Sequence, residues 1–246
     1  MTTHPAPPSS TTRKALAWCV HLYTALGLVA DAAIAVLIVR GDPHSIHWAF
    51  AVMLLACVID GTDGTLARAI KVKQVLPGFD GARLDDIVDF LSYTFLPLLL
   101  IWRIGILPPH VNWVLLAPLL ASAYGFCQVN AKTSDGYFLG FPSYWNVVAF
   151  YLYVLQFPPW LSVCILLLLA VLTFVPSRYL YPSQRGLLND VTALLGLAWA
   201  GLVVYVLYQL FQDSHEQARR VALVSLAFPV YYMVVSWIVS IRHWRG

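Results

Sequence analysis

Long apolar runs interrupted by few charges are the feature that most constrains this chain. Hydrophobic residues make up 60% of its 246 residues and charged residues only 11%, whereas soluble domains carry about 25% charged residues. Most of the runs approach the ~20 residues that a helix needs to cross the hydrocarbon core of a bilayer. Eight such segments can be marked, at about residues 15–39, 47–70, 82–104, 111–130, 142–157, 159–176, 187–211 and 219–241. The sequence therefore predicts an all-α integral membrane protein, a bundle of about eight transmembrane helices.

The boundaries of this bundle follow from proline and from composition. Pro158 and Pro159 favour a break between the fifth and sixth segments, and the alternative is one long irregular segment. Residues 1–13 are rich in Pro, Ser and Thr and predict a disordered tail. The apolar run that follows is longer than the core of an ordinary signal peptide, so we interpret it as the first span. We find no internal repeat and expect residues 14–246 to form a single transmembrane domain.

Basic residues predict the orientation in the membrane. With the N-terminus inside, eleven of the fifteen basic residues fall in the inner segments. They are Arg13, Lys14, Arg68, Lys71, Lys73, Arg83, Lys132, Arg178, Arg185, Arg242 and Arg245. The outer segments hold Arg40, Arg103, Arg219 and Arg220. Because cytoplasmic loops carry the excess of Lys and Arg, both termini are predicted to be cytoplasmic.

The four cysteines all lie inside apolar runs. They are Cys19, Cys57, Cys127 and Cys164. None is spaced from another as metal ligands are, so disulfides and cysteine metal sites are not expected. We interpret them as small core residues.

Five carboxylates in or beside the second and third segments interrupt the apolar pattern. They are Asp60, Asp63, Asp85, Asp86 and Asp89. Ionised groups in or beside a span are costly unless they are paired or bound to metal. Such residues also occur in interfacial water or in a capped turn, and that alternative applies to any one of them alone.

Helical spacing brings four of these carboxylates together. At 100° per residue, Asp60, Asp63 and the residues Gly64, Ala67 and Arg68 lie within an arc of about 140° on one helix. On the next helix, Gly81, Asp85 and Asp89 follow one another at steps of four residues. The two helices are expected to pack antiparallel, so that both carboxylate pairs lie near the cytoplasmic end. Asp86 points elsewhere, where it favours the start of its helix.

The residue types around the carboxylates indicate phosphoryl transfer. Four carboxylates in one place require countercharge, and hard divalent cations such as Mg²⁺ or Mn²⁺ prefer oxygen ligands. Gly64 and Ala67 allow a ligand to approach the backbone closely. Arg68 supplies a planar cation suited to phosphate.

These residues resemble the signature of the CDP-alcohol phosphatidyltransferase family, D-x-x-D-G-x-x-A-R followed by G-x-x-x-D-x-x-x-D. The chain reads Asp60 to Arg68 as DGTDGTLAR and Gly81 to Asp89 as GARLDDIVD, so all eight fixed positions match. The spacer between Arg68 and Gly81 has twelve residues, whereas the usual family pattern has eight. The longer spacer, segments 123–153 and 174–184, and eight spans rather than six resemble the bacterial members that use choline.

The resemblance implies a fold and a reaction. We expect a six-helix core of the family type, a location in the bacterial inner membrane and an active site on the cytoplasmic side. The reaction would transfer the phosphatidyl group of CDP-diacylglycerol to choline with release of CMP. Homodimers are usual in the family, so a homodimer is expected, whereas a nucleic-acid partner is not.

The resemblance also implies roles for individual residues. Asp60, Asp63 and Asp85 would hold two Mn²⁺ or Mg²⁺ ions on the diphosphate, while Asp89 would help to bind metal and act as the catalytic base. The expected CDP-binding residues are Asp60, Gly64, Ala67, Arg68, Gly81 and Thr24. Thr24 belongs to His21-Leu22-Tyr23-Thr24, where many members carry Asn-x-x-Thr. His21 departs from that pattern, and a core role is the alternative for it.

Choline would be recognised through its quaternary ammonium, which binds best to aromatic faces. The fourth and fifth segments offer candidates near the cytoplasmic face: Tyr124, Asp135, Tyr144 and Trp145. The alternative for the aromatic residues is an interfacial belt. Lys71, Arg83 and Arg178 are candidates for lipid phosphate, with plain positive-inside flanks as the alternative. For Asp31, in the first span, the sequence identifies no partner.

Two other functions remain open at this stage. A related enzyme of the family would use another alcohol, such as serine, glycerol phosphate or an inositol compound. The aromatic acceptor region, poor in Lys and Arg, favours a cationic and unphosphorylated alcohol. A cation transporter would place its acidic site near the midplane, whereas these carboxylates group near one end beside Arg68.

Overall fold

The computed structural model describes residues 11–129, 131, 133, 137–180 and 187–245. The predicted tail of residues 1–13 lies mostly outside this part of the chain. Its last three residues do not, and they are helical, because the first helix begins at Thr11. The prediction therefore placed the start of the first helix too late.

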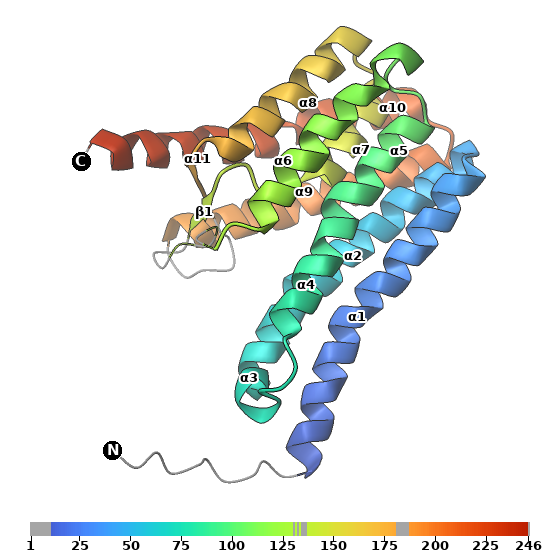
Figure 1. The fold of residues 1–246 in the computed structure, drawn as a ribbon. Coiled ribbons are helices and arrows are strands. Elements are labelled where there is room, and N and C mark those ends of the chain that lie inside the picture. Colours follow the sequence, from blue (N-terminus) through green and yellow to red (C-terminus); the bar gives the residue numbers. More distant parts are fainter. Residues whose placement is uncertain (1–10, 130, 132, 134–136, 181–186, 246) are drawn as a thin grey trace.

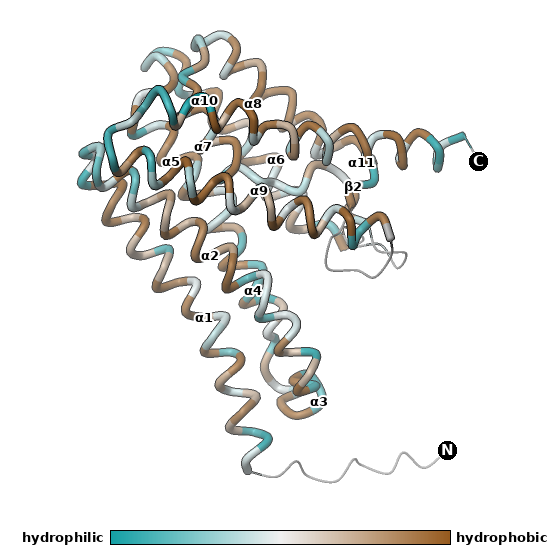
Figure 2. Tube along the Cα trace, turned by 180° about the vertical axis from the view of Figure 1, so that it is seen from behind, coloured by the Kyte–Doolittle hydropathy of each residue, from teal (hydrophilic) through white to brown (hydrophobic). Residues whose placement is uncertain are grey.

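The described chain is almost entirely helical (Figure 1). The helices are α1 (Thr11–Arg40), α2 (Pro43–Ile70), α3 (Val72–Val75), α4 (Gly81–Asp89), η1 (Phe90–Phe95), α5 (Leu96–Arg103), η2 (Pro109–Leu115), α6 (Leu116–Phe126), α7 (Trp145–Leu155), α8 (Pro159–Phe174), α9 (Leu187–Phe211), α10 (His215–Ser225) and α11 (Ala227–Arg245). Their apolar residues dominate the trace, and hydrophilic residues gather near helix ends (Figure 2). The all-α membrane class predicted from the apolar runs is confirmed.

Each of the eight predicted segments contains helix among the described residues, but the helices differ in length. Four helical stretches among the described residues are long and apolar enough to cross a membrane: α1, α2, most of α9, and α10 with α11. The third segment is divided into α4, η1 and α5, and the fourth into η2 and α6. Helix α7 has only 11 residues and spans about 16 Å at 1.5 Å per residue. This is short of a hydrocarbon core about 30 Å thick, so α7 is not a full span.

Local chemistry explains where α2 begins and ends. Asp42 caps its first turn by accepting a hydrogen bond from the backbone N–H of Ser45 at 2.9 Å, and Pro43 takes the first helical position. At the other end Lys71 adopts a left-handed conformation with φ of 57°, and its N–H bonds to the carbonyls of Ala67 and Arg68. This turn redirects the chain into α3.

The spacer of residues 69–80 forms a small packed unit. Val72 of α3 is buried and packs with Ala17 and Val20 of α1 in a second, minor core. Phe79 lies against the ring of His21, with ring centres 4.4 Å apart. The longer spacer therefore packs against the N-terminal half of α1.

Helix α1 supports both acidic helices. It packs along α2 and also against α4, where Gly27 allows a close approach: a Cβ at this position would lie 2.4 Å from Cγ1 of Val88. We expected the two acidic helices to pack antiparallel. In the structure α1 packs against both and joins them, and their acidic residues face each other across a gap.

A π-helical segment follows Asp89 directly. It covers Phe90–Phe95 and is continuous with α4 before it and α5 after it. Ser92 within it donates a 2.7 Å hydrogen bond to Oδ1 of Asp31 in α1. Asp31 therefore has a partner that the sequence did not identify. Segments of π-helix are rare and often accompany functional sites.

The centre of the main core is the short helix α7. Trp145 is wholly buried and its indole N–H donates a 2.7 Å hydrogen bond to Oγ of Ser122 in α6. The helix ends at Leu155, and α8 begins at Pro159 after Pro158. The double proline thus separates two helices, as predicted, and the alternative of one irregular segment is excluded.

A two-stranded antiparallel sheet was not predicted. It pairs β1 (Tyr137–Leu139) with β2 (Arg178–Leu180). Oγ of Ser240 and Oγ of Ser236 in α11 accept hydrogen bonds from the N–H groups of Arg178 and Leu180. Strands of three residues are too short to show the two-residue alternation of hydrophobic side chains, so the sequence did not predict them.

The cysteines are placed differently from the prediction. Cys19, Cys127 and Cys164 are exposed, and only Cys57 is partly buried. In a membrane protein, residues that face lipid are as apolar as those in the core, so an apolar run does not indicate burial. The prediction that all four are core residues was wrong for three of them.

The turns of the helical hairpins gather at opposite ends. At one end, the ring of His44 contacts Phe211, with ring centres 5.4 Å apart, and the guanidinium of Arg103 approaches the carbonyl of Arg40. The spacer with α3 and the β1–β2 sheet lie away from that end (Figure 1). Turns at alternate ends of the molecule are expected where successive spans run in opposite directions, as the sequence predicts.

Candidate active site

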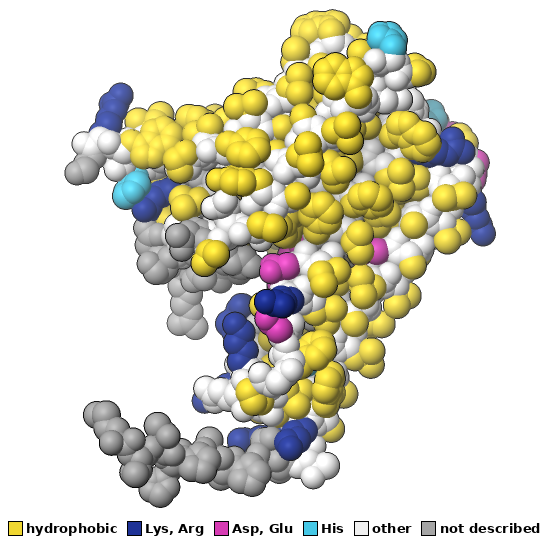
Figure 3. Space-filling view, viewed as in Figure 1, with side chains coloured by type: hydrophobic (Ala, Val, Ile, Leu, Met, Phe, Trp, Pro, Cys, Tyr) yellow, Lys and Arg dark blue, Asp and Glu magenta, His cyan; other side chains and the backbone are white. Residues whose placement is uncertain are grey.

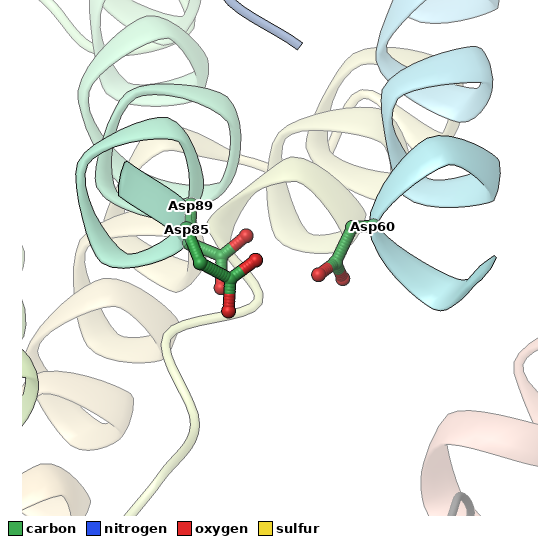
Figure 4. Close-up of side chains that lie close together, drawn as sticks. All are labelled: Asp60, Asp85 and Asp89. Carbon is green, nitrogen blue, oxygen red and sulfur yellow. The ribbon is translucent and has the colours of Figure 1, made fainter. Parts of the chain in front are cut away.

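Three carboxylates converge across the gap between α2 and α4. Asp60 comes from α2, while Asp85 and Asp89 come from α4. One oxygen of each lies within 4.8 Å of the others, and the carboxylates point toward one another (Figure 4). The surface carries acidic side chains in the hollow between the arm formed by α1 to α4 and the rest of the molecule (Figure 3). The i,i+4 spacing of Asp85 and Asp89 places both on one face of α4.

Tyr93 fixes the Asp60 carboxylate. Its hydroxyl donates a 2.7 Å hydrogen bond to Oδ2 of Asp60. Tyr93 lies in the π-helical segment, four residues after Asp89. A phenol held against this carboxylate links α2 to the helix that carries the other two. Tyr93 was not among the predicted site residues, because nothing in its spacing distinguishes it from other aromatic residues in the apolar runs.

Asp63 lies outside this group of three. It is 5% exposed, and its Oδ2 accepts a 2.7 Å hydrogen bond from Oγ1 of Thr24 in α1. The expectation that all four aspartates converge is therefore corrected: Asp63 is turned toward α1. Thr24, singled out as a polar contact in the first span, holds this carboxylate.

The motif glycines differ in what surrounds them. A Cβ at Gly81 would lie 2.5 Å from Cε1 of His21, so the absence of a side chain lets α4 begin directly against α1. His21 is buried, which supports the core alternative for this residue. A Cβ at Gly64 would meet only the flexible guanidinium of Arg68, at 3.3 Å. Gly64 therefore leaves open space beside the acidic face.

The basic residues predicted to bind phosphate lie in different surroundings. Nη2 of Arg68 donates a 3.1 Å hydrogen bond to Oγ1 of Thr65, one turn before it on the exposed face of α2. Arg83 forms an ion pair with Asp80 at 3.3 Å. Arg178 lies over the ring of Tyr137 and contacts Nε2 of His243 at 3.0 Å. Lys71 is exposed in its left-handed turn, and Asp86 is exposed on α4, next to Asp85 but outside the group of three carboxylates.

A largely apolar cavity of about 580 Å³ lies among α2, η1, α7, α9 and α11. Cys57 and Tyr93 connect its wall to the carboxylates, because Cys57 lies one turn before Asp60. Of the residues predicted to bind choline, Tyr144 lines this cavity. Trp145 is wholly buried in the core, and Tyr124 is exposed with its ring on Phe174. Asp135 and the basic residues Lys132 and Arg185 lie outside the described residues.

The donor set of the carboxylate cluster fits a hard divalent cation. Three carboxylate oxygens within 4.8 Å of one another offer only oxygen ligands, as Mg²⁺ and Mn²⁺ prefer. Like charges this close destabilise one another without countercharge. A membrane-embedded helical bundle with such a cluster, beside open space at Gly64 and the guanidinium of Arg68, defines a phosphoryl-transfer enzyme acting at the bilayer.

Comparison with known proteins gives the family. The profile of the CDP-alcohol phosphatidyltransferase family matches residues 20–175, and the chain belongs to this family. It is 40% identical over 196 residues to phosphatidylcholine synthase of Pseudomonas aeruginosa, covering 78% of this chain and 81% of that protein. It is 36% identical over 198 residues to phosphatidylcholine synthase of Legionella bozemanae, covering 79% and 91%. The chain is thus a multi-pass membrane protein and a transferase.

Proposed function

We propose that this chain transfers the phosphatidyl group of CDP-diacylglycerol to choline and releases CMP. The observation that carries the proposal is the cluster of Asp60, Asp85 and Asp89 at the positions of the family signature. The similarity to proteins named phosphatidylcholine synthase supports choline as the acceptor. The cavity beside the cluster supports it too, since no Lys or Arg is among the described residues that line it.

The reaction forms one bond to phosphorus and breaks another. The choline oxygen attacks the β-phosphorus of CDP-diacylglycerol, and the bond from that phosphorus to the bridging oxygen breaks. CMP leaves with the electron pair. The hydroxyl proton of choline passes to the Asp89 carboxylate, the general base of this proposal. Asp89 suits this role because it lies at the end of α4, where the acidic cluster meets Tyr93 and the cavity.

The carboxylates of Asp60, Asp85 and Asp89 would hold divalent cations, and Asp63 would join them while its Oδ2 keeps the hydrogen bond from Thr24. A bound divalent cation supplies charge neutralisation at the diphosphate. Mn²⁺ and Mg²⁺ both suit the oxygen donors, and two ions would balance the four carboxylates. Tyr93 holds the Asp60 carboxylate in place through its 2.7 Å hydrogen bond.

The CDP moiety is assigned to the open face of α2. Gly64 leaves room for the nucleotide, while Ala67 carries only a methyl group beside it and packs partly against the minor core. Arg68 is available to the diphosphate at the exposed side of this face. Gly81 and Thr24 act through their neighbours, His21 and Asp63. Lys71, exposed at the end of α2, is the best placed of the three basic candidates for lipid phosphate, since Arg83 and Arg178 already have partners.

The location and assembly of the enzyme are part of the proposal. We infer the bacterial inner membrane, with both termini and the carboxylate cluster on the cytoplasmic side, from the distribution of Lys and Arg. A homodimer is inferred from the family alone.

One assay tests the reaction. Purified protein in detergent receives labelled CDP-diacylglycerol, Mn²⁺ and choline, serine, glycerol 3-phosphate or no alcohol. We expect CMP release that depends on choline. Release with serine or glycerol 3-phosphate instead would assign another acceptor, and no release with any alcohol would refute the transferase.

A separate variant tests the assignment of Asp89 as the general base. Asp89→Asn should lower turnover by at least about 100-fold, as expected for the loss of a general base, while CDP-diacylglycerol still binds. Asp86→Asn is the matched control, because Asp86 is exposed on the same helix. Near-normal turnover in Asp89→Asn would refute the assignment.

A further inference from the structure

The wall of the large cavity nearest the carboxylates is aromatic. Tyr144, at the start of α7, lies between two other tyrosines that line the same cavity. Its ring centre is 6.3 Å from that of Tyr93 and 6.2 Å from that of Tyr232, at interplanar angles of 64° and 58°. The three rings come from η1, α7 and α11 and present differently oriented surfaces to one space. We call them the tyrosine cluster.

Each flanking ring is held by a hydrogen bond. The hydroxyl of Tyr93 donates to Asp60, and that of Tyr232 donates to the carbonyl of Leu180 in β2 at 2.9 Å. The β2 strand is itself attached to α11 through Ser236 and Ser240. The unpredicted sheet therefore positions Tyr232, and ring positions fixed in this way suit recognition of a small ligand.

The charge of the lining selects the kind of ligand. No Asp, Glu, Lys or Arg is among the described residues that line the cavity. A phosphorylated or anionic group placed here would lack a countercharge. A quaternary ammonium is different, because it donates no strong hydrogen bond and is attracted to the faces of aromatic rings. Its charge is also favoured by the nearby carboxylates.

The position of the tyrosine cluster beside the base suits a short amino alcohol. Tyr93 follows Asp89 by four residues along a continuous helix, so both side chains lie on one side of it. Choline carries its hydroxyl two carbon atoms from its nitrogen. An ammonium against Tyr93 and Tyr144 therefore brings the hydroxyl toward Asp89.

We propose that Tyr93, Tyr144 and Tyr232 bind the quaternary ammonium of the acceptor and thereby make the enzyme specific for choline. This proposal rests on the proposed function. It assigns to the tyrosine cluster the selection that Tyr124 and Trp145 were expected to provide. The cluster does not move protons or contact the phosphorus; it determines which alcohol reaches Asp89.

Two competing roles make different predictions. If the rings only fill the core, their replacement lowers stability without changing the preference among acceptors. If the cavity holds the diacylglycerol part of the substrate, the KM for CDP-diacylglycerol rises instead. The test therefore compares two acceptors and follows both substrates.

The experiment uses the full chain in detergent with Mn²⁺, and the variants Tyr144→Leu, Tyr144→Phe, Tyr232→Leu and Tyr232→Phe. The acceptors are choline and its neutral carbon isostere, in which a tert-butyl group replaces the trimethylammonium group. Tyr208→Leu is the matched control, because Tyr208 is exposed on α9 and is absent from the lining. Each variant is measured for kcat and KM of both substrates.

We expect each leucine variant to raise the KM for choline about tenfold, as befits the loss of one desolvated cation–π contact. The ratio of kcat/KM between choline and the isostere should fall by a similar factor. Tyr144→Phe and Tyr208→Leu should keep that ratio within about threefold of the unmodified enzyme, because Phe retains the aromatic face. Tyr232→Phe should lower the ratio less than Tyr232→Leu, since it loses the hydrogen bond to Leu180 but keeps the ring. The KM for CDP-diacylglycerol should change less than about twofold.

An unchanged ratio in the leucine variants would overturn the proposal, and so would a rise confined to the KM for CDP-diacylglycerol. Both results leave choline-dependent CMP release intact in the unmodified enzyme. Absence of that release would instead refute the proposed function, so the two failures are distinguishable.

Discussion

The hydroxyl of Ser92 donates a 2.7 Å hydrogen bond to Oδ1 of Asp31, which joins the first helix to the π-helical segment. Both residues are 4% exposed. A buried carboxylate is tolerated only with such partners. The bond lies one residue before Tyr93, whose hydroxyl reaches Asp60. Asp31 is not part of the carboxylate cluster, and we assign it the role of holding the π-helical segment in register.

We therefore predict coupling between Asp31 and Ser92. Asp31→Ala and Ser92→Ala should each lower the free energy of unfolding by about 1–3 kcal/mol, because each leaves a buried polar partner unsatisfied. The double variant should lose clearly less than the sum of the two. Reversible unfolding in mixed micelles measures all three. Additive losses, agreeing within about 0.5 kcal/mol, would mean that the bond does not contribute.

The hydrogen bond from Thr24 to Asp63 leads to a second prediction. Thr24→Val keeps the shape of the side chain and removes the donor to Oδ2 of Asp63. Loss of a partner that orients a ligating carboxylate typically costs about 10- to 100-fold in metal affinity. We expect the Mn²⁺ concentration for half-maximal activity to rise by about tenfold at least. Thr24→Ser should remain close to the unmodified enzyme, since it retains the hydroxyl.

The comparison of Thr24→Val with Thr24→Ser separates two roles for Asp63. If Asp63 serves only to attach α2 to α1, Thr24→Val lowers stability while the Mn²⁺ dependence stays the same. That outcome would remove Asp63 from the metal site. Direct Mn²⁺ binding, followed by electron paramagnetic resonance, gives the same comparison without turnover.

The carboxylate cluster predicts stabilisation by metal. Asp60, Asp85 and Asp89 repel one another when ionised, and a cation relieves this only in the folded state. At a free metal concentration of about 100 times Kd, a bound ion raises the free energy of unfolding by about 2.7 kcal/mol. This corresponds to a rise in Tm of about 5–10 °C for a chain of this size. We expect Mn²⁺ to produce this rise and EDTA to reverse it.

Single variants test whether the ion that raises Tm is bound at the carboxylate cluster. Asp85→Asn should abolish most of the shift in Tm with Mn²⁺, because it removes one of the three converging ligands. Asp86→Asn should keep it, since that carboxylate is exposed and lies outside the group of three converging ligands. An equal shift in both variants would place the bound ion elsewhere in the molecule.

Spacing along a helix predicted part of this site well. Asp85 and Asp89 repeat with the helical period on α4, and the structure brings them together with Asp60 of α2. Asp63 obeyed the same spacing but is turned toward Thr24. Angular position on one helix does not reveal a third helix that competes for the side chain. Here α1 packs against both acidic helices.

Features that depend on contacts between distant segments could not be predicted. The partner of Asp31 is Ser92, 61 residues away. Tyr93 and Tyr232 become neighbours of Tyr144 only after a π-helical segment and a short sheet have formed. Trp145 was expected at an aqueous interface, but its indole bonds to Ser122 within the core. Hydrophobic periodicity distinguishes none of these, because lipid-facing and buried positions are both apolar.

The contact between Gly81 and His21 supports a prediction of compensation. A Cβ at Gly81 would lie 2.5 Å from Cε1 and 2.9 Å from Nδ1 of the buried imidazole. Gly81→Ala should therefore push the start of α4 away from α1 and displace Asp85, one turn further on. We expect turnover to fall by about tenfold or more, because a displacement of about 1 Å at a catalytic group can cost 100-fold. Overpacking of this kind also lowers stability by about 1–3 kcal/mol.

Removing the imidazole should restore the space. In His21→Ala/Gly81→Ala the added methyl group meets no ring, so turnover should return to within about threefold of His21→Ala alone, the strong coupling expected for residues in contact. Gly78→Ala is the matched control, since a Cβ there meets nothing within 4 Å. If the double variant is as impaired as Gly81→Ala, then Gly81 is needed for contact with the nucleotide itself. In that case the KM for CDP-diacylglycerol should rise in both variants that carry Ala at position 81.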